Sequence, residues 1–270
     1  MAGPAASSES YSGTSGLAVS LRGVTKVYDN GVNALGPLDL DVRKGEFVSL
    51  LGPSGCGKST ALRLIAGLNA PTSGSVRVSH RADQERAGDS IGFVFQEPTL
   101  MPWANVRENV RLPLKLSHAP AAEASAHVGE ALIQAGLAEF AEAYPRELSG
   151  GMKMRVSLAR ALVTDPDILL MDEPFAALDE ITRFRLNNDL LSLWRNLRKT
   201  VIFVTHSVFE SVYLSQRVVM MTPRPGRLSA EIRIDAPERG EEFRTSAEYA
   251  AYCREVSHAL APLQSGQPGS

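Results

Sequence analysis

The length and charge of the chain already exclude several classes of protein. It has 270 residues, which suits one large α/β domain or a core with one insertion. Twenty-eight basic and 30 acidic side chains leave a net charge of -2, which gives no long-range attraction for nucleic acid or anionic lipid. The two cysteines, Cys56 and Cys253, are too few for a disulfide framework and lack the spacing of a zinc site. We therefore expect a reducing compartment and no nucleic-acid partner.

The apolar runs are too short for a membrane helix, which needs about 18 to 20 residues. The longest runs, such as 168–171 and 201–204, are strand-sized. No Lys or Arg precedes Arg22 and no hydrophobic block lies there, so we expect no secretory signal. The sequence thus predicts a cytoplasmic chain without a membrane span.

Strand-like and helical runs alternate along most of the chain, which is typical of an α/β core. The alternation breaks between 97 and 163, where 121–135 and 151–164 are predicted helices with no strand between them. This pattern indicates a helical insertion. The predicted strands are 17–22, 38–43, 46–51, 75–79, 91–95, 168–172, 201–205, 217–221 and 228–234.

The same patterns divide the chain into five segments. Residues 1–16 are rich in Ala, Ser, Gly and Pro and are predicted to be a disordered tail. A β portion with the first part of the core spans 17–96, the helical subdomain 97–163, and the second part of the core 164–235. The segment 236–270 is predicted to be a C-terminal helix with a flexible end, and both a regulatory and a surface role stay open for it.

A glycine-rich loop follows the predicted strand and precedes a helix predicted at 61–68. Its sequence is Gly52-Pro53-Ser54-Gly55-Cys56-Gly57-Lys58-Ser59-Thr60, the GxxxxGK[ST] pattern of a phosphate-binding P-loop. The glycines let successive N–H groups face one anion, and the helix N-terminus adds partial positive charge. We expect Lys58 to reach the β and γ phosphates and the Ser59 hydroxyl to ligate Mg²⁺. Cys56 fills the loop and is not expected to act as a nucleophile.

A P-loop needs an acidic partner for its metal, and the strand 168–171 ends at Asp172-Glu173. Asp172 is expected to hold Mg²⁺, directly or through water. Glu173 is placed to polarise an attacking water as general base. His206 follows the strand 201–205, at the edge where doubly wound sheets bind their ligands, and is a candidate γ-phosphate contact. The alternatives are a solvated acidic pair and a structural histidine.

A further motif, Leu148-Ser149-Gly150-Gly151, lies in the helical insertion. The ordered series of P-loop, Gln96, this motif, Asp172-Glu173, Ala177-Leu178-Asp179 and His206 resembles the ABC-type ATPase cassettes from about residue 18 to 235. The resemblance implies a P-loop NTPase (RecA-like) core with an N-terminal antiparallel β portion and an inserted helical subdomain. It also implies hydrolysis of ATP with Mg²⁺. Taken alone, the motif is a helix start with Ser149 as its N-cap.

The resemblance further implies a head-to-tail dimer with ATP at its seam. Ser149 and the amides of Gly150 and Gly151 would bind the γ phosphate held on the P-loop of a second copy. Asp179 would lie at the seam. Gln96 would sense Mg²⁺ and the attacking water, and Tyr28 would stack on adenine.

The motif that begins at Leu148 corresponds to the signature motif of this family. One position departs from its commonest form, which ends in Gln where this chain has Met152. The departure puts in doubt a side-chain contact to the ribose of the facing nucleotide. The same ending is frequent in the branch that imports nitrate, aliphatic sulfonates, taurine and thiamine precursors. The runs 99–103 and 221–227 also resemble that branch.

Partners follow from the same resemblance, because a chain without a span must act on another polypeptide. It implies integral-membrane permease subunits, a substrate-binding protein acting indirectly, and a place at the cytoplasmic face of the plasma membrane. Trp103, with Met101 and Leu100, is a candidate socket for a permease helix; packing inside the insertion is the alternative. The helix 180–199 is interpreted as core and surface, with its arginines solvated, and we assign it no chemistry. Its inward residues are predicted to be Leu190, Trp194 and Leu197.

The sequence therefore predicts the ATP-hydrolysing subunit of an importer for a small oxyanion or sulfonate. A soluble mechanical ATPase is the alternative, although the coiled-coil arms or paired cassettes typical of that class are not visible. A small-molecule kinase would use the P-loop but would leave 148–151 without a role. The transported solute stays open because none of its atoms need touch this chain.

Overall fold

The computed structural model describes residues 16–79, 91–236 and 238–264. Apart from Gly16, the predicted N-terminal tail lies outside the described residues, and so does the predicted flexible end beyond 264. Within the described part of the chain, no helix is both long and apolar enough to cross a membrane.

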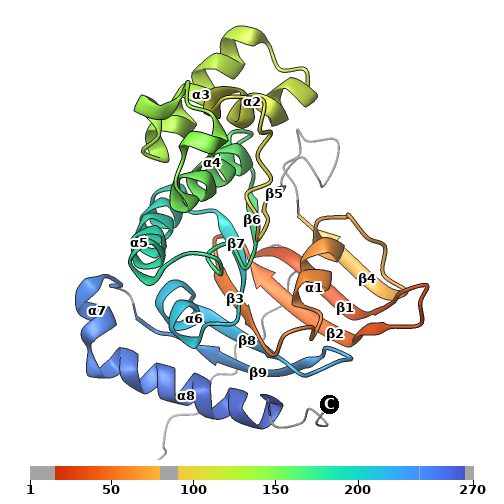
Figure 1. The fold of residues 1–270 in the computed structure, drawn as a ribbon. Coiled ribbons are helices and arrows are strands. Elements are labelled where there is room, and N and C mark those ends of the chain that lie inside the picture. Colours follow the sequence, from red (N-terminus) through yellow and green to blue (C-terminus); the bar gives the residue numbers. More distant parts are fainter. Residues whose placement is uncertain (1–15, 80–90, 237, 265–270) are drawn as a thin grey trace, which may run out of the picture.

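A six-stranded sheet forms the centre of the molecule, in the order β5-β6-β7-β3-β8-β9 (Figure 1). All neighbouring pairs are parallel except β8 and β9. Because β3, β7 and β6 are adjacent and parallel, their carboxyl ends meet at one edge. The strands are β3 (Phe47–Leu51), β5 (Ile91–Val94), β6 (Ile168–Asp172), β7 (Thr200–Thr205), β8 (Arg217–Met221) and β9 (Leu228–Arg233).

The central strands are buried on both faces, which explains their continuous apolar sequences. In β3, Phe47 and Leu51 belong to one core cluster, whereas Val48 and Leu50 belong to the other. Adjacent side chains of a strand point to opposite faces, so the sheet separates two cores. The expected α/β core therefore rests on a two-sided sheet.

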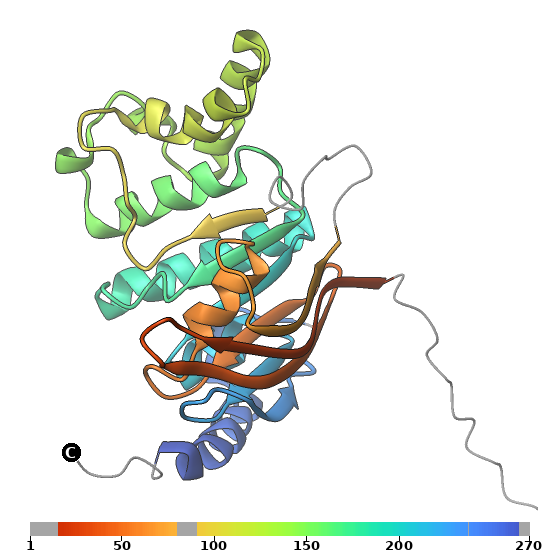
Figure 2. The ribbon, with the colours of Figure 1, turned by 90° about the vertical axis from the view of Figure 1, so that its right-hand side faces the viewer.

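A smaller antiparallel sheet covers one face, in the order β2-β1-β4. Its strands are β1 (Leu17–Val27), β2 (Asn33–Arg43) and β4 (Ser73–Val78). The helix α1 (Lys58–Ile65) packs in the same core cluster as this sheet and the large one (Figures 1 and 2). The N-terminal antiparallel β portion expected from the sequence is confirmed.

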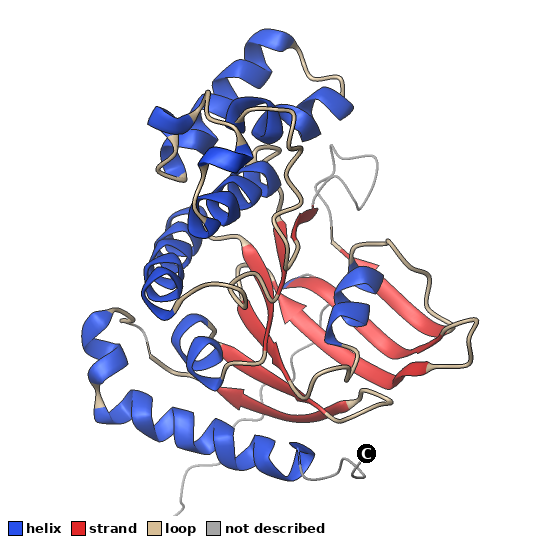
Figure 3. Ribbon diagram, viewed as in Figure 1, coloured by secondary structure: helices blue, strands red, loops and turns tan. Residues whose placement is uncertain are grey.

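Helices cover the other face of the large sheet. They are α5 (Glu180–Leu197), α6 (Val208–Leu214), α7 (Glu241–Thr245) and α8 (Ala247–Gln264). The long helix α8 runs beside α6 (Figure 3), and its Tyr249, Cys253 and Val256 are buried in the same core cluster as β3 and α5. The described part of the C-terminal segment is thus an integral part of the core.

A separate helical layer stands on the sheet, as expected for an insertion. It contains α2 (Val106–Leu116), α3 (Ala121–Gln134), α4 (Gly150–Leu162) and the short 3₁₀ turns Ala138–Phe140 and Pro145–Glu147. The sequence predicted α3 and α4 but not α2, which carries Pro113 inside it, where proline usually breaks a helix. The helix α4 is shared between cores: Val156 packs in the helical layer, whereas Met154 packs against the sheet.

Candidate functional site

The P-loop connects β3 to α1 at the carboxyl edge of the large sheet. Gly55 and Gly57 have φ angles of 74° and 102°, which side-chain-bearing residues rarely adopt. Gly57 is the N-cap of α1 and supplies no side-chain cap. The first N–H groups of α1 therefore receive no side-chain cap from Gly57, a geometry that suits the anion site predicted from the sequence.

Lys58 is folded back over this loop. Its side chain is buried at 4% exposure, and Nζ donates to the carbonyl oxygens of Gly52 at 2.8 Å and Pro53 at 3.0 Å. The thiol of Cys56 lies 3.8 Å from the same nitrogen. Burial raises the pKa of the Cys56 thiol, which keeps it protonated and agrees with its interpretation as a loop filler.

Ser59 and Asp172 meet across the edge of the sheet. The Ser59 hydroxyl donates to Oδ1 of Asp172 at 2.7 Å, and Asp172 is only 9% exposed. Burial raises the pKa of this carboxyl, while the Ser59 hydrogen bond and the charges of Arg63 and Lys58 oppose the shift. A hydroxyl and a carboxylate of adjacent elements are thus paired at the spot where a P-loop metal binds.

Glu173 and His206 form the next contact along this edge. His206 Nδ1 lies 3.3 Å from Oε2 of Glu173, and the Glu173 N–H donates to the carbonyl oxygen of Val204 at 3.0 Å. Glu173 has a φ of 46°, an uncommon conformation for a residue with a side chain. Its carboxylate contacts His206, whereas that of Asp172 accepts from Ser59.

Tyr28 also reaches the start of α1. Its hydroxyl lies 3.3 Å from Oγ1 of Thr60, and Lys26 Nζ lies 5.3 Å from the centre of its ring. The aromatic ring is half-buried beside the P-loop. This placement brings the proposed adenine contact next to the phosphate site.

The motif residues 149–151 lie at the start of α4 in the helical layer, apart from the P-loop and the strand ends described above. The exposed Ser149 caps α4 by accepting a hydrogen bond from the Met152 N–H at 3.3 Å. A Cβ on Gly151 would lie 2.6 Å from Cγ2 of Thr182, so α4 packs closely on the start of α5. Thr182 in turn donates its N–H at 2.9 Å to the exposed Asp179, which lowers the pKa of that carboxyl.

Within the described residues, the motif 149–151 and Asp179 are not joined to the P-loop side of the site. No hydrogen bond or ion pair there links 149–151 or Asp179 to the P-loop, Asp172 or Glu173. Gln96 is exposed two residues after β5 and, in the same part of the chain, has no hydrogen bond to Ser59 or Asp172. The structure therefore places one half of the expected site at the carboxyl edge of the large sheet and the other half at the N-termini of α4 and α5.

Sequence reasoning missed Arg160 of α4, which holds the segment after Gln96. Its guanidinium donates to the carbonyl oxygens of Pro98 at 2.7 Å and Thr99 at 2.9 Å. This fixes the segment that follows Gln96 to the helix that begins at the signature motif. No pattern in the sequence indicated this pairing, because carbonyl acceptors are present at every residue.

The loop 222–227 supports the P-loop from outside it. Arg224 Nε donates to the Gly55 carbonyl oxygen at 2.9 Å, and the Gly226 N–H donates to the Ala34 carbonyl oxygen at 3.0 Å. A Cβ on Gly226 would lie only 1.9 Å from the carbonyl oxygen of Cys56. In the sequence, the run 221–227 resembles one branch of importers but gives no sign of this contact with the P-loop.

The interpretation that the arginines of the helix 180–199 are solvated is wrong for Arg183. Leu190 is buried and Trp194 and Leu197 are half-buried, but Arg183 is not simply solvated. Its Nη2 donates to the Leu178 carbonyl oxygen at 2.8 Å, and its Nε lies 3.8 Å from Oε1 of Glu210. Glu210, which the sequence analysis did not single out, is 8% exposed, and burial raises its pKa.

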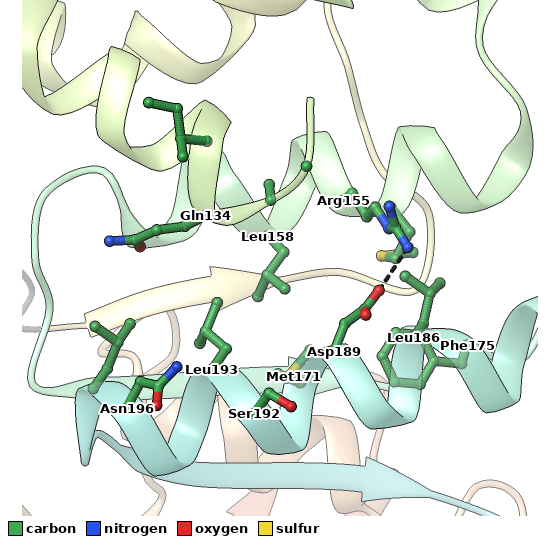
Figure 4. Close-up of a pocket in the computed structure, with 15 residues that line it drawn as sticks. Gln134, Arg155, Leu158, Met171, Phe175, Leu186, Asp189, Ser192, Leu193 and Asn196 are labelled. Atoms are coloured by element: carbon green, nitrogen blue, oxygen red, sulfur yellow. Dashed lines mark hydrogen bonds and ion pairs between the residues drawn. The ribbon is translucent and has the colours of Figure 1, made fainter. Parts of the chain in front are cut away.

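A cavity of about 360 Å³ lies between the helical layer and α5 (Figure 4). Its walls are mostly apolar, with Leu158, Met171 and Phe175 among them. An ion pair between Arg155 and Asp189, 2.6 Å apart, bridges it from α4 to α5. Since its lining contains no P-loop residue, this cavity is separate from the nucleotide site.

The comparisons with known proteins agree with the expected fold, a P-loop core with an inserted helical subdomain. The family model described as ABC transporter matches residues 35–176. A taurine import ATP-binding protein of Rhizobium johnstonii is 46% identical over 215 residues, which is 80% of this chain and 82% of that protein. A nitrate import ATP-binding protein of Synechocystis is 43% identical over 239 residues, 85% of this chain and 88% of that protein.

Among solved structures, the ATP-binding cassette MJ0796, a dimer in a post-hydrolysis state bound to ADP and Pi, is 36% identical. It aligns with a TM-score of 0.70 over 81% of this chain and 99% of that one. The chain belongs to the ABC transporter family. It is an ATP-binding subunit of that family with the ATPase cassette fold, and an ATP hydrolase.

The close approach of the loop 222–227 gives a first prediction. Gly226→Ala places a methyl group against the Cys56 carbonyl, so the P-loop must shift and ATP affinity should fall about tenfold or more. Isothermal titration with ATP measures the loss, and circular dichroism checks the fold. Gly129→Ala, where a Cβ meets nothing within 4 Å, is the matched control. Unchanged affinity in the Gly226 variant contradicts the supporting role of this loop.

Proposed function

We propose that this chain powers import through a separate membrane permease by ATP-driven dimerisation. The transported solute is nitrate, an aliphatic sulfonate, taurine or a similar small solute, as the names of the taurine and nitrate import relatives suggest. The chain then works at the cytoplasmic face of the plasma membrane, held there by the permease. A substrate-binding protein delivers the solute and contacts this chain only indirectly.

The proposal rests on the division of the site between the edge of the large sheet and the helical layer. The P-loop, Asp172, Glu173 and His206 gather at the sheet edge, whereas the N-terminus of α4 with Ser149 is exposed on the helical layer. A second copy related by a two-fold axis supplies the missing half to each site. The solved dimer of the related cassette MJ0796 supports this assembly.

In the proposed site, the P-loop residues from Gly52 to Thr60 hold the phosphates through backbone N–H groups and Lys58. Tyr28 stacks on the adenine. Ser149, Gly150 and Gly151 of the partner copy bind the γ phosphate, and Asp179 lies at the seam. Each contact to the γ phosphate is lost on hydrolysis, so the dimer loosens when ATP is consumed.

A magnesium ion fits the residues present. No cluster of three metal-ligating His, Cys, Asp or Glu side chains occurs in the described residues, but Mg²⁺ usually binds through one or two carboxylates together with phosphates. Ser59, Asp172 and Gln96 would hold it. Once bound, the ion neutralises charge that develops on the transferred phosphoryl oxygens.

Glu173 is the proposed general base. Its side chain is 23% exposed, and the Ser59 hydroxyl donates to Asp172 rather than to Glu173, so the Glu173 carboxylate is left to take a proton from water. His206, 3.3 Å away, orients that carboxylate and reaches the γ phosphate. Glu173→Gln should lower turnover by about 10² to 10⁴ and leave ATP affinity near its original value. Steady-state kinetics and ATP titration test this, and near-normal turnover removes Glu173 from the role.

Ser149→Arg tests the dimer itself, because the bulky cation blocks the exposed N-terminus of α4. In a Glu173→Gln background with ATP, light scattering should find dimers for the parent and monomers for the Ser149 variant. Asn105→Ala, which removes the cap of α2 in the same layer, should still dimerise. Both helix caps contribute roughly 0.5 to 2 kcal/mol, so the control matches the stability cost. A Ser149 variant that dimerises, or that loses monomer ATP affinity too, contradicts the proposal.

Trp103 is the proposed anchor of the permease, since its side chain is 77% exposed just after the segment that follows Gln96. Trp103→Ala should reduce recovery of integral-membrane partners from detergent extracts about tenfold or more, because buried tryptophans dominate interfaces. Basal ATP hydrolysis should stay unchanged. Leu116→Ala, also apolar and 69% exposed on the helical layer, is the control. Loss of basal hydrolysis without loss of partners would contradict the role of Trp103 as permease anchor.

A further inference from the structure

The buried carboxyl of Glu210 and the half-buried guanidinium of Arg183 form an ion pair behind the contact between Glu173 and His206. Glu210 on α6 is 8% exposed, and its Oε1 lies 3.8 Å from Nε of Arg183 on α5. Its Oε2 accepts a hydrogen bond from the Thr205 hydroxyl at 2.5 Å. Glu210 therefore contacts both the end of β7 and the helix that follows Asp179.

On one side, Glu210 fixes the turn that carries His206. The Thr205 hydroxyl donates to Glu210 and accepts from the Ser207 N–H at 3.0 Å. The Ser207 hydroxyl accepts from the Glu210 N–H at 3.2 Å. The residues on both sides of His206 are thus held by one small hydrogen-bond ring, while the imidazole itself stays 57% exposed. The ring of bonds sets where His206 can point.

On the other side, Arg183 fixes the segment that precedes α5. Its Nη2 donates to the carbonyl oxygen of Leu178 at 2.8 Å, one residue before Asp179. The recess between the two segments is lined by Glu173, Ala176 and His206 as well as by Arg183 and Glu210. The ion pair is therefore the polar connection between the proposed seam residue and the proposed phosphate contact.

Arg183 and Glu210 form an ion pair but not a hydrogen bond. Arg183 Nε is buried without a hydrogen-bond partner, and 3.8 Å is an ion-pair distance too long for a hydrogen bond. Burying an unsatisfied guanidinium N–H is unfavourable. A shorter distance between Arg183 Nε and Glu210 would satisfy this group. Because Arg183 also holds the Leu178 carbonyl, we expect the Leu178 segment and α6 to move together.

We propose that Glu210 and Arg183 are positioning residues that couple Leu178 and Asp179 to His206, so that engagement of the seam sets His206 against Glu173. The inference rests on the proposed function, because it needs Asp179 to meet a second copy. It adds a route by which the partner's arrival is communicated to the reacting end of the site. Neither residue touches nucleotide.

The test measures ATP turnover of the full chain in single and double variants. Glu210→Gln keeps an acceptor for Thr205 but removes the charge that faces Arg183, and Arg183→Gln removes the other charge. Each should lower kcat about tenfold or more with KM for ATP within about twofold, because only orientation is lost. Since both changes break one link, the double variant should be no slower than the slower single variant.

The control breaks a comparable ion pair on the same helix. Asp189→Asn removes the partner of Arg155, also between α5 and a neighbouring element, and should leave kcat unchanged. ATP-dependent dimerisation in the Glu173→Gln background should survive Glu210→Gln, which a purely structural role would not predict. Multiplicative losses in the double variant, or a kcat for Glu210→Gln like that of Asp189→Asn, would overturn the coupling.

Two further measurements keep the outcomes separate. If Glu210→Gln does not fold, Thr205→Val breaks the other end of the link, the hydrogen bond from the Thr205 hydroxyl to Glu210, without changing charge. It should give a similar loss of kcat at unchanged KM, and normal kcat there overturns the coupling. If the unmodified chain hydrolyses ATP without dimerising, the proposed function fails. If it dimerises and turns over ATP but the variants behave like the control, only the coupling fails.

Discussion

The parallel register of β3, β7 and β6 is the constraint on which the site depends. Leu51 pairs with Thr205, and Val204 pairs with Asp172, so three strands end level with one another. The P-loop, His206 and Glu173 each begin where one of these strands stops. Functional groups far apart in sequence are therefore brought together by backbone hydrogen bonds of the sheet, and the hydrogen bond between Ser59 and Asp172 fastens the edge.

Sequence patterns predicted the elements whose signal is local. The apolar strands, the glycine spacing of the P-loop and the polar residues at strand ends each reflect a short-range requirement, and the structure places Ser59 against Asp172 and Glu173 against His206. The helix α2 was missed because Pro113 contradicts helix propensity, and tertiary packing around Val106 and Val110 overrides it. The supporting contacts of Arg160, Arg183 and Arg224 were missed because each acceptor is a backbone carbonyl, which has no sequence signature.

The helix α4 gives the helical layer its place on the molecule. One side packs in the core of that layer through Val156, and the other packs against the sheet through Met154. Its N-terminus carries the signature motif, and its Arg160 holds the segment after Gln96. One helix therefore connects the proposed phosphate contact of the partner's site with the segment that leads to Trp103.

Ser149 can serve both its own helix and a ligand because of the chemistry of a hydroxyl. Its oxygen accepts from the Met152 N–H as the cap of α4, and the hydroxyl proton remains free to donate to an anion. Asp179 caps α5 with the same geometry, but an ionised carboxylate has no proton to donate and its charge repels phosphate. Both residues are good N-caps, so helix stability alone does not distinguish them. The neutral donor stands at the helix that we propose to contact the γ phosphate, and the charged cap stands at the helix beside it, which we propose to lie at the seam with a second copy.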